Sequence, residues 1–216
     1  MKWEKWEPIY QEILEEFGYD RQRDEEAAII AEKISAENEK IDEFYLRDTI
    51  KGRIVSICGA VITEKDVREM EGLIFSADEA TSFLLRRYIL PDIIVTDLDG
   101  CIEDILKANE RGSIAIIHAH GDNIDAIKKY LPKFKGKIML TTQSKPLNSV
   151  YNFGGFTDGD RAYCIARHFN AKEIKLFGFD FLHPKPKKGK NIEIKMRKLK
   201  WAKKIIRLIE KEHRMF

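Results

Sequence analysis

From Arg53 onward, the chain alternates short apolar runs rich in β-branched residues with segments of helical periodicity. The predicted strands cover residues 54–58, 73–76, 93–96, 114–118, 138–141 and 173–177, and the predicted helices between them cover 64–70, 80–88, 102–110, 122–130 and 160–169. Wholly apolar strands separated by amphipathic helices are typical of parallel βαβ units that are buried on both faces. The pattern therefore predicts an α/β fold with a doubly wound, mostly parallel, Rossmann-like sheet of about six strands.

The first 52 residues, in contrast, show helical periodicity only. Apolar side chains recur at helical spacing between Trp3 and Phe17 and would form one apolar stripe. Gly18 is suited to end this helix, and Asp20 can cap the next one. We therefore predict that residues 1–52 form a helical segment without chemistry of its own, packed as a cap on an α/β domain of residues 53–216.

Composition narrows the class of protein. Apolar residues make up 44% of the 216 residues, which is enough for a full core and excludes a wholly disordered chain. No apolar run is long enough to span a bilayer, and the first residues lack the apolar stretch of a secretory signal. Cys58, Cys101 and Cys164 are scattered and fit free thiols in a reducing compartment. We expect a soluble cytoplasmic protein that does not associate with membranes.

The net charge is only +2, but it is unevenly distributed. Residues 185–216 hold 13 Lys or Arg against 3 Asp or Glu, so the rest of the chain is acidic. This excess begins in a Pro- and Gly-containing loop with Lys185, Lys187, Lys188 and Lys190 and continues in a predicted basic C-terminal helix with Lys195 and Lys198. We expect most of these side chains to be solvated and a few to fold over a polyphosphate.

The strongest signal for chemistry lies in residues 91–100, PDIIVTDLDG. An apolar strand delivers Asp97 and Asp99 at its carboxyl end, which is where open parallel sheets bind ligands. If the chain stays extended there, residues two apart point the same way. Two neighbouring carboxylates suit Mg²⁺, which leaves its other positions for water and phosphate oxygens. In the alternative interpretation, Asp97 caps the following helix, and Asp99 forms a turn with Gly100.

The next strand along the chain also ends in polar residues. They are His118, His120, Asp122 and Asn123. Two histidines suggest a transition-metal pair, but no third ligand follows at a suitable spacing, so a hydrogen-bonded loop histidine is favoured for His118. Asp122 is either a helix cap or, if the two strands are neighbours, a third acid beside Asp97 and Asp99. Asp78 likewise follows a predicted strand and precedes a helix.

A loop rich in glycine and asparagine covers residues 148–161, NSVYNFGGFTDGDR, and opens a predicted helix. Gly154 and Gly155 permit positive φ and a close approach of the backbone to a ligand. Asn152 offers amide hydrogen bonds, and the aromatic residues beside it offer ring faces to a flat heterocycle. A plain structural loop is the alternative.

Taken together and in order, four segments resemble those of a known family: ADEATSFLLRRYILPDIIVTDLDG, IIHAHGDN, GGFTDGDRA and KEIKLFGFDF. They are similar to the archaeal 6-hydroxymethyl-7,8-dihydropterin pyrophosphokinases, the MptE-like group, over about residues 54–200. PDIIVTDLD and the acid that follows the next strand resemble thiamin pyrophosphokinase more distantly. The resemblance implies Mg²⁺-dependent transfer of the pyrophosphoryl unit of ATP to the hydroxymethyl group of a reduced pterin, with release of AMP, in the synthesis of methanopterin- or folate-type carriers.

The resemblance also implies roles by position. Asp97 and Asp99 would hold Mg²⁺ on the ATP phosphates, with Asp122 as a third acid, and Lys195 and Lys198 match basic positions that contact phosphates. Further candidates for contacts with the pterin or the nucleotide are Asp78, His120, Asn123, Asn152, Gly154, Gly155 and Asp180.

The chain departs from the family after the first predicted strand. Relatives commonly have a glycine-proline-serine turn there, whereas this chain continues from Gly59 through Ala60 to the β-branched Val61, Ile62 and Thr63. β-Branched residues tolerate positive φ poorly, so we do not expect a glycine-type phosphate cradle at this position. Either the phosphates are held elsewhere or the use of the nucleotide has shifted.

Two alternatives to a pterin pyrophosphokinase stay open. One keeps the transfer chemistry but changes the acceptor to thiamin or a sugar. The other is a non-catalytic protein that binds nucleic acid through its basic tail. It is less favoured, because Trp201 is the only aromatic residue of the predicted C-terminal helix and no stacking platform accompanies the charges. The oligomeric state is left open, with a homodimer among the possibilities.

Overall fold

The computed structural model of the protein describes residues 1–183 and 191–213. Its centre is a seven-stranded sheet of β1 (Ile54–Cys58), β2 (Leu73–Ala77), β3 (Ile93–Thr96), β4 (Ile114–Ala119), β5 (Ile138–Thr142), β6 (Val150–Tyr151) and β7 (Glu173–Phe177). The strand order is β6-β5-β4-β3-β2-β1-β7, and every pairing is parallel. The predicted α/β fold with a parallel sheet is confirmed.

The sheet has one strand more than expected. The six predicted strands are all present, and the additional strand is β6 at the sheet edge. It consists of Val150 and Tyr151 alone and pairs with Leu140 and Thr141 of β5. Two residues are too few to produce the run of apolar residues from which a buried strand is recognised.

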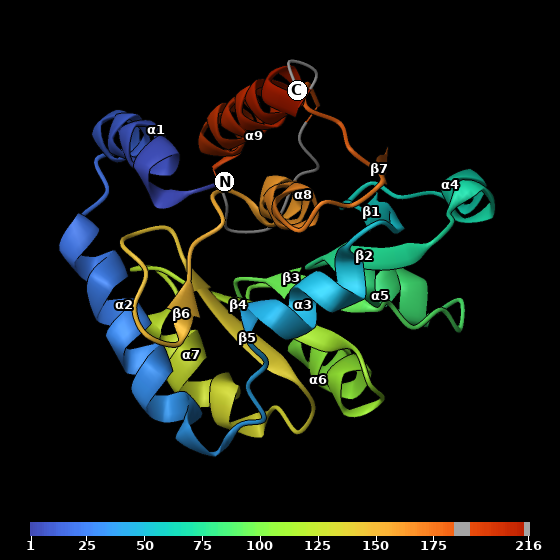
Figure 1. The fold of residues 1–216 in the computed structure, drawn as a ribbon, viewed down its shortest axis with the longest axis horizontal. Helices are drawn as coiled ribbons and strands as arrows, with labels where there is room; N and C mark the ends of the chain where they lie inside the picture. The colour runs from blue at the N-terminus through green and yellow to red at the C-terminus, as the bar shows by residue number, and fades with distance from the viewer. Residues whose placement is uncertain (184–190, 214–216) are drawn as a thin grey trace.

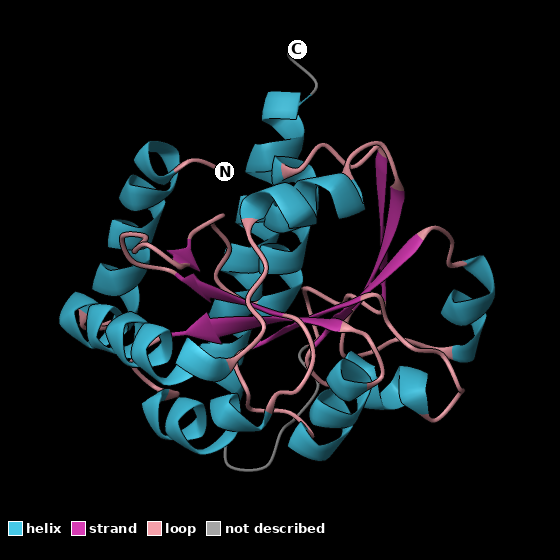
Figure 2. Ribbon diagram, turned by 60° about the horizontal axis from the view of Figure 1, so that its bottom comes forward, coloured by secondary structure: helices cyan, strands magenta, loops and turns pink. Residues whose placement is uncertain are grey.

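Helices cover both faces of the sheet (Figures 1 and 2). They are α1 (Trp3–Phe17), α2 (Arg21–Ile34), α3 (Glu43–Ile50), α4 (Glu64–Glu69), α5 (Ala80–Leu85), α6 (Ile102–Glu110), α7 (Ile124–Tyr130), α8 (Asp158–His168) and α9 (Ile192–His213), with short 3-10 turns at Ser35–Glu37 and Leu131–Lys133. In Figure 1, α1, α8 and α9 lie above the sheet, and α6 and α7 lie below it. None of the helices in the described ranges is both long and apolar enough to cross a membrane.

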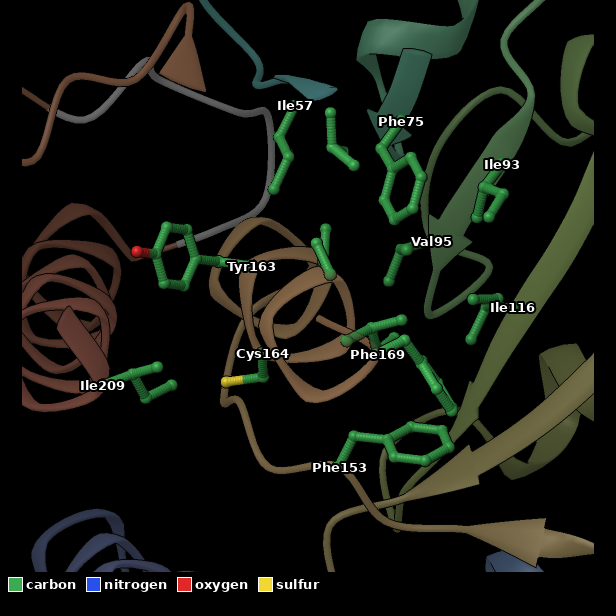
Figure 3. Packing of buried hydrophobic residues seen from close by; sticks show 14 of the residues in the cluster. Ile57, Phe75, Ile93, Val95, Ile116, Phe153, Tyr163, Cys164, Phe169 and Ile209 are labelled. Atoms are coloured by element: carbon green, nitrogen blue, oxygen red, sulfur yellow. The ribbon is translucent and has the colours of Figure 1, made fainter. Parts of the chain in front are cut away.

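The larger apolar core lies between the sheet and α8. Phe75 of β2 and Val95 of β3 point from the strands toward α8, where Phe169 meets them (Figure 3). Tyr163 on the same helix faces α9. Because α8 packs against the middle strands of the sheet, the start of this helix is brought to their carboxyl ends.

α1 of the N-terminal segment packs on this same core, whereas Ala27, Ala28 and Ala31 of α2 belong to a second apolar cluster with Ile94 and Ile117. α1 buries Trp6, Tyr10, Ile13 and Leu14, which recur at intervals of three or four residues and so share one face of the helix. Gly18 ends α1 with a φ of 66°, and the Asp20 carboxylate caps α2 by accepting from the amide of Gln22. The apolar core therefore continues from the sheet into residues 1–52, whereas the boundary between two domains at residue 52 stays a prediction.

Candidate active site

A cavity of about 720 Å³ lies at the carboxyl ends of the strands. Its walls come from the segments after β1, β2, β3, β4 and β7, the start of α8, the turn between α1 and α2, and the first turns of α9. Of the residues predicted for the site, it is lined by Asp78, Asp97, Asp99, His120, Asp122, Asp180, Lys195 and Lys198. This is the position at which open α/β sheets bind ligands.

Three carboxylates meet in this cavity. Asp78 follows β2, Asp97 follows β3, and Asp158 is the first residue of α8. Each offers one oxygen, and the three oxygens lie within 4.8 Å of one another. Hard carboxylate oxygens at this spacing are suitable ligands for a divalent cation such as Mg²⁺.

The position of Asp78 is held by its surroundings. Its backbone has a φ of 42°, which is uncommon for a residue other than glycine, and its Oδ1 accepts from the Thr96 hydroxyl at 2.7 Å. Gly100 lies so close that a Cβ there would be 2.4 Å from Asp78 Oδ2. Residue 100 therefore has to be glycine for this carboxylate to keep its place. An unusual backbone maintained by such contacts is characteristic of functional sites.

Asp99 does not join this group, because the chain does not stay extended after β3. Leu98 has a φ of 67°, and the amide of Asp99 donates back to Asp97 Oδ1 at 3.2 Å. The extended chain on which the pairing of Asp97 with Asp99 depended is therefore not present, and Asp99 lines the cavity outside the three-carboxylate group. The alternative cap is not formed by Asp97 either, since Cys101 holds the N-cap position of α6.

Asp122 also lies outside the three-carboxylate group, although it lines the same cavity. The N-cap position of α7 belongs to Asn123, whose side-chain amide donates to the backbone oxygens of Asp97 and His118, both at 2.7 Å. Asn123 is thus a tie between the loops after β3 and β4. Asn123 itself is not one of the described residues that line the cavity.

The two acids nearest to Arg161 have opposite pKa shifts. Burial alone would raise the pKa of Asp97, but the His120 ring at 3.6 Å, together with Arg161 and Lys198, outweighs burial and holds that pKa well below its usual range. Burial and then the charge of Asp97 raise the pKa of Asp158 well above its usual value, although Arg161 pairs with it at 2.9 Å. The surroundings of Asp158 therefore supply too little positive charge to stabilise its ionised form, and a bound cation would supply it.

His118 and Arg161 are buried in the wall of the cavity, with exposed fractions of 1% and 3%. Burial is the main reason that the pKa of His118 lies well below its usual value, and the Arg161 guanidinium lowers it further. His118 Nδ1 lies 3.1 Å from the Thr141 hydroxyl, so His118 is hydrogen-bonded, as favoured from the sequence, but it lies in β4 and not in a loop. Its Nε2 and the Nε of Arg161 are buried and have no hydrogen-bond partner in the described ranges.

In the glycine- and asparagine-rich loop, the three residues proposed for the site, Asn152, Gly154 and Gly155, make structural contacts within the protein. Asn152 donates to Ser144 O and accepts from the amide of Gly154, so its amide bonds are internal to the loop. Gly154 and Gly155 have positive φ, as expected, but a Cβ on Gly155 would be 2.4 Å from Arg161 Cα. The described lining of the cavity includes none of these three residues and begins in this loop at Phe156, followed by Thr157 and Asp158.

The N-terminal segment contributes to the site, which the sequence did not predict. Asp24 of α2 lines the cavity and is buried, and its carboxylate accepts from Tyr10 Oη at 2.6 Å, Gln143 Nε2 at 2.8 Å and Gly121 N at 2.7 Å. A signal was present in the sequence. Asp24 is in phase with Ala27, Ala28 and Ala31, which form the buried face of α2.

The segment after β1 does not form a phosphate cradle. The amides of Gly59, Val61 and Ile62 donate to Phe177 O, Gly178 O and Gly59 O, so they are already used within the protein. Thr63 caps the short α4 that follows. Gly59 to Val61 still line the cavity, as apolar wall. The basic loop residues Lys185, Lys187, Lys188 and Lys190 lie outside the described residues.

Comparison with known proteins places this arrangement in a family. A family model described as 6-hydroxymethylpterin diphosphokinase MptE-like matches residues 64–185. Two proteins named 6-hydroxymethyl-7,8-dihydropterin pyrophosphokinase are similar over nearly the whole chain: that of Methanocaldococcus jannaschii is 40% identical over 97% of this chain and 96% of its own, and that of Pyrococcus furiosus is 39% identical over 99% and 96%. A protein of the same name from Methanothermobacter thermautotrophicus is 40% identical over 83% of this chain and 77% of its own. The chain therefore belongs to the MptE-like family of 6-hydroxymethylpterin diphosphokinases.

Proposed function

We propose that this protein transfers the β,γ-pyrophosphoryl group of ATP to the hydroxymethyl oxygen of 6-hydroxymethyl-7,8-dihydropterin. The products are AMP and the pterin diphosphate, a precursor for methanopterin- or folate-type carriers. The observation that carries this proposal is the group of Asp78, Asp97 and Asp158 in a cavity that Lys195 and Lys198 also line. The names of the archaeal relatives support the choice of acceptor.

Asp78, Asp97 and Asp158 would hold Mg²⁺. The fit rests on their oxygen ligands and on the raised pKa of Asp158, which is caused first by burial and then by the charge of Asp97. When bound, Mg²⁺ neutralises charge on the phosphate oxygens of ATP.

The other residues of the site would position the acceptor oxygen and the phosphate chain. In this reaction the acceptor oxygen forms a bond to the β-phosphorus, the bond from that phosphorus to the α-phosphate oxygen breaks, and AMP leaves. Lys195 and Lys198 line the cavity and would bind the phosphate chain. The hydroxyl proton needs an acceptor, and Asp122, which lines the cavity outside the three-carboxylate group, would accept it.

The test is product analysis with the purified protein. ATP should yield AMP, and the pterin should yield its diphosphate, only when Mg²⁺ and 6-hydroxymethyl-7,8-dihydropterin are both present. Thiamin in place of the pterin should yield no AMP. Turnover with thiamin and none with the pterin would contradict the proposed acceptor, because the acceptor pocket rather than the acid group sets specificity.

Two basic residues in the helical part of the tail are paired with acids of α1. Arg197 bonds to Glu16, and Lys204 bonds to Glu12 at 2.9 Å, both across to α1. Lys198 is turned toward the cavity, where its charge affects the pKa of Asp97. These contacts favour the catalytic interpretation of α9.

Lys198→Met should raise the KM for ATP about tenfold, because it removes a charge that would lie on the phosphates and keeps the apolar stem. Steady-state kinetics with varied ATP at a saturating pterin concentration measures the change. Lys200→Met is the matched control, since Lys200 is exposed on the same helix and is not among the described lining residues. Equal KM values for the two variants would contradict a role of Lys198 in binding ATP.

Mg²⁺ should raise the melting temperature more at pH 8 than at pH 5. The pKa of Asp158 is raised above its usual value of 3.8 by burial and by Asp97, so the folded protein holds this proton more tightly than the unfolded chain does. The contribution of Asp158 to stability is therefore full below pH 3.8 and is lost as the pH rises through the folded-state pKa. A cation bound between the carboxylates offsets that loss.

Circular dichroism melts in MgCl₂ and in EDTA measure both shifts. Asp158→Asn is the control, because it has no titrating group at this position and should show a smaller Mg²⁺ shift at pH 8. Equal shifts of the wild-type protein at the two pH values would contradict this prediction.

A further inference from the structure

One end of the cavity carries two buried polar atoms for which the described residues provide no hydrogen-bond partner. His118 Nε2 and Arg161 Nε are both buried, both residues line the cavity, and neither atom has a hydrogen-bond partner among the described residues. The charge of Arg161 acts on His118, so the two groups are close to each other. Buried polar atoms are almost always bonded, and a pair without partners in a cavity wall indicates a ligand.

The hydrogen bonds behind His118 define what its Nε2 can do. The Thr141 hydroxyl has one proton, which it donates to Ile117 O at 3.4 Å. We therefore assign His118 Nδ1–H as the donor to Thr141 Oγ1, at 3.1 Å. Nε2 then presents a lone pair and accepts a hydrogen bond. Arg161 Nε carries a proton and donates, so this part of the wall offers one acceptor and one donor.

Gln143 lines the same end of the cavity, and its amide is held in one orientation. Its Nε2 donates to Asp24 Oδ2 at 2.8 Å, which turns its Oε1 away from the Asp24 carboxylate. Asp24 is itself fixed by the Tyr10 hydroxyl and the Gly121 amide. The structure thus holds Gln143 through a buried network, as expected for a side chain that recognises a ligand by its hydrogen bonds.

Aromatic rings lie in the wall beside these polar groups. Tyr19 of the α1–α2 turn and Phe156 both line the cavity, with ring centroids 6.4 Å apart. Flat apolar faces next to a few oriented polar atoms are the usual wall of a site for a heterocycle.

The buried Asp24 carboxylate at this end has no cation among its hydrogen-bond partners in the described part of the chain. The three hydrogen-bond partners of the buried Asp24 carboxylate are neutral groups: a hydroxyl, a side-chain amide and a backbone amide. A carboxylate in this setting repels a polyphosphate. A neutral ring with N–H groups meets no such repulsion here.

We propose that this end of the cavity, formed by Tyr19, Asp24, His118, Gln143 and Arg161, binds the fused ring of the acceptor. It rests on the proposed function, because the ring is that of the reduced pterin. His118 Nε2 accepts from a ring N–H, and Arg161 Nε donates to a ring nitrogen or oxygen. A pterin carries N–H donors and acceptors on adjacent atoms, which matches this pair. The ATP phosphates then lie toward Lys195 and Lys198 of α9, and Lys198 borders both parts of the cavity, because its Nζ lies 5.6 Å from the ring centroid of Tyr19 and 5.4 Å from that of Phe156.

The test measures binding of 6-hydroxymethyl-7,8-dihydropterin alone, by fluorescence titration, and the KM values for pterin and ATP. His118→Asn keeps a polar atom near Thr141 but has none at the Nε2 position, so we expect the dissociation constant for the pterin to rise about tenfold. His118→Gln places an amide near the Nε2 position and should recover part of the affinity. Gln143→Leu should weaken pterin binding similarly, while the KM for ATP stays within about twofold in all three variants.

The matched control is Gln22→Leu on the exposed side of α2, which should bind the pterin as the wild type does. A rise of the KM for ATP, with unchanged affinity for the pterin, in His118→Asn and Gln143→Leu would overturn the inference and leave the proposed function standing. Wild-type protein that binds the pterin, loses it in these variants and forms no AMP would support the ring site and refute the transfer reaction. Wild-type protein that does not bind the pterin would overturn both.

Discussion

Asp97→Asn and Asp158→Asn should each lower kcat by about a hundredfold to a thousandfold, whereas Asp122→Asn should lower it less. Asp97 and Asp158 belong to the group whose oxygens lie within 4.8 Å of one another, and Asp122 lies outside it. An amide keeps the size of the side chain but removes the negative charge that a divalent cation requires. The rate of AMP release at saturating ATP, Mg²⁺ and pterin measures the three effects.

The comparison is meaningful because the three substitutions are chemically identical. Asp125→Asn, exposed in the first turn of α7, is the control for the loss of a carboxylate as such. Circular dichroism of each variant shows whether the fold is kept. If Asp122→Asn lost as much activity as Asp97→Asn while Asp158→Asn stayed active, the group of three predicted from the sequence would be the functional one.

Trp6→Ala should lower the free energy of unfolding by about 3–5 kcal/mol. Trp6 is fully buried between α1 and the core, stacks on Tyr10 with ring centroids 6.4 Å apart, and donates from Nε1 to Gln143 O at 2.8 Å. The substitution leaves a large cavity and an unpaired carbonyl in the segment that supports Gln143. Equilibrium unfolding in urea, followed by circular dichroism, measures the loss.

Two further variants separate packing from hydrogen bonding. Trp6→Phe keeps much of the apolar volume, so its loss should be smaller than that of Trp6→Ala. Phe44→Ala is the control, because Phe44 is 66% exposed and its truncation should change stability by less than about 0.5 kcal/mol. A similar loss in Trp6→Ala and Phe44→Ala would mean that α1 does not stabilise the sheet.

Local sequence patterns were sufficient to predict the sheet, because its strands are buried on both faces. Residues 93–96 and 114–117 are apolar or β-branched throughout, and each became a central strand. Helix ends that carry a sequence signal were also predicted correctly. Gly18 ends α1, and Asp20 caps α2. β6 could not be found in this way, because its pairing with β5 depends on tertiary contact rather than on a local pattern.

The sequence was sufficient to predict where the site lies, but not which carboxylates form its central group. Asp97 was expected at the carboxyl end of β3 and is there, but Leu98 adopts a left-handed conformation, and Asp99 lies outside the three-carboxylate group. Nothing in the local pattern of a leucine predicts this. Asp158 joins the group because α8 packs across the sheet and brings its first residue to β2 and β3, a long-range contact that no spacing along the chain reveals.

The hydrogen bonds by which Asn123 joins the loops after β3 and β4 also affect attempts to change the acceptor that the protein uses. One amide of Asn123 spans the backbone oxygens of Asp97 and His118, which belong to the proposed metal site and the proposed ring site. Substitution of Asn123 would therefore disturb both sites at once. Directed evolution of acceptor choice is better begun at Tyr19 and Phe156. Both residues line the same cavity, and neither takes part in these hydrogen bonds of Asn123.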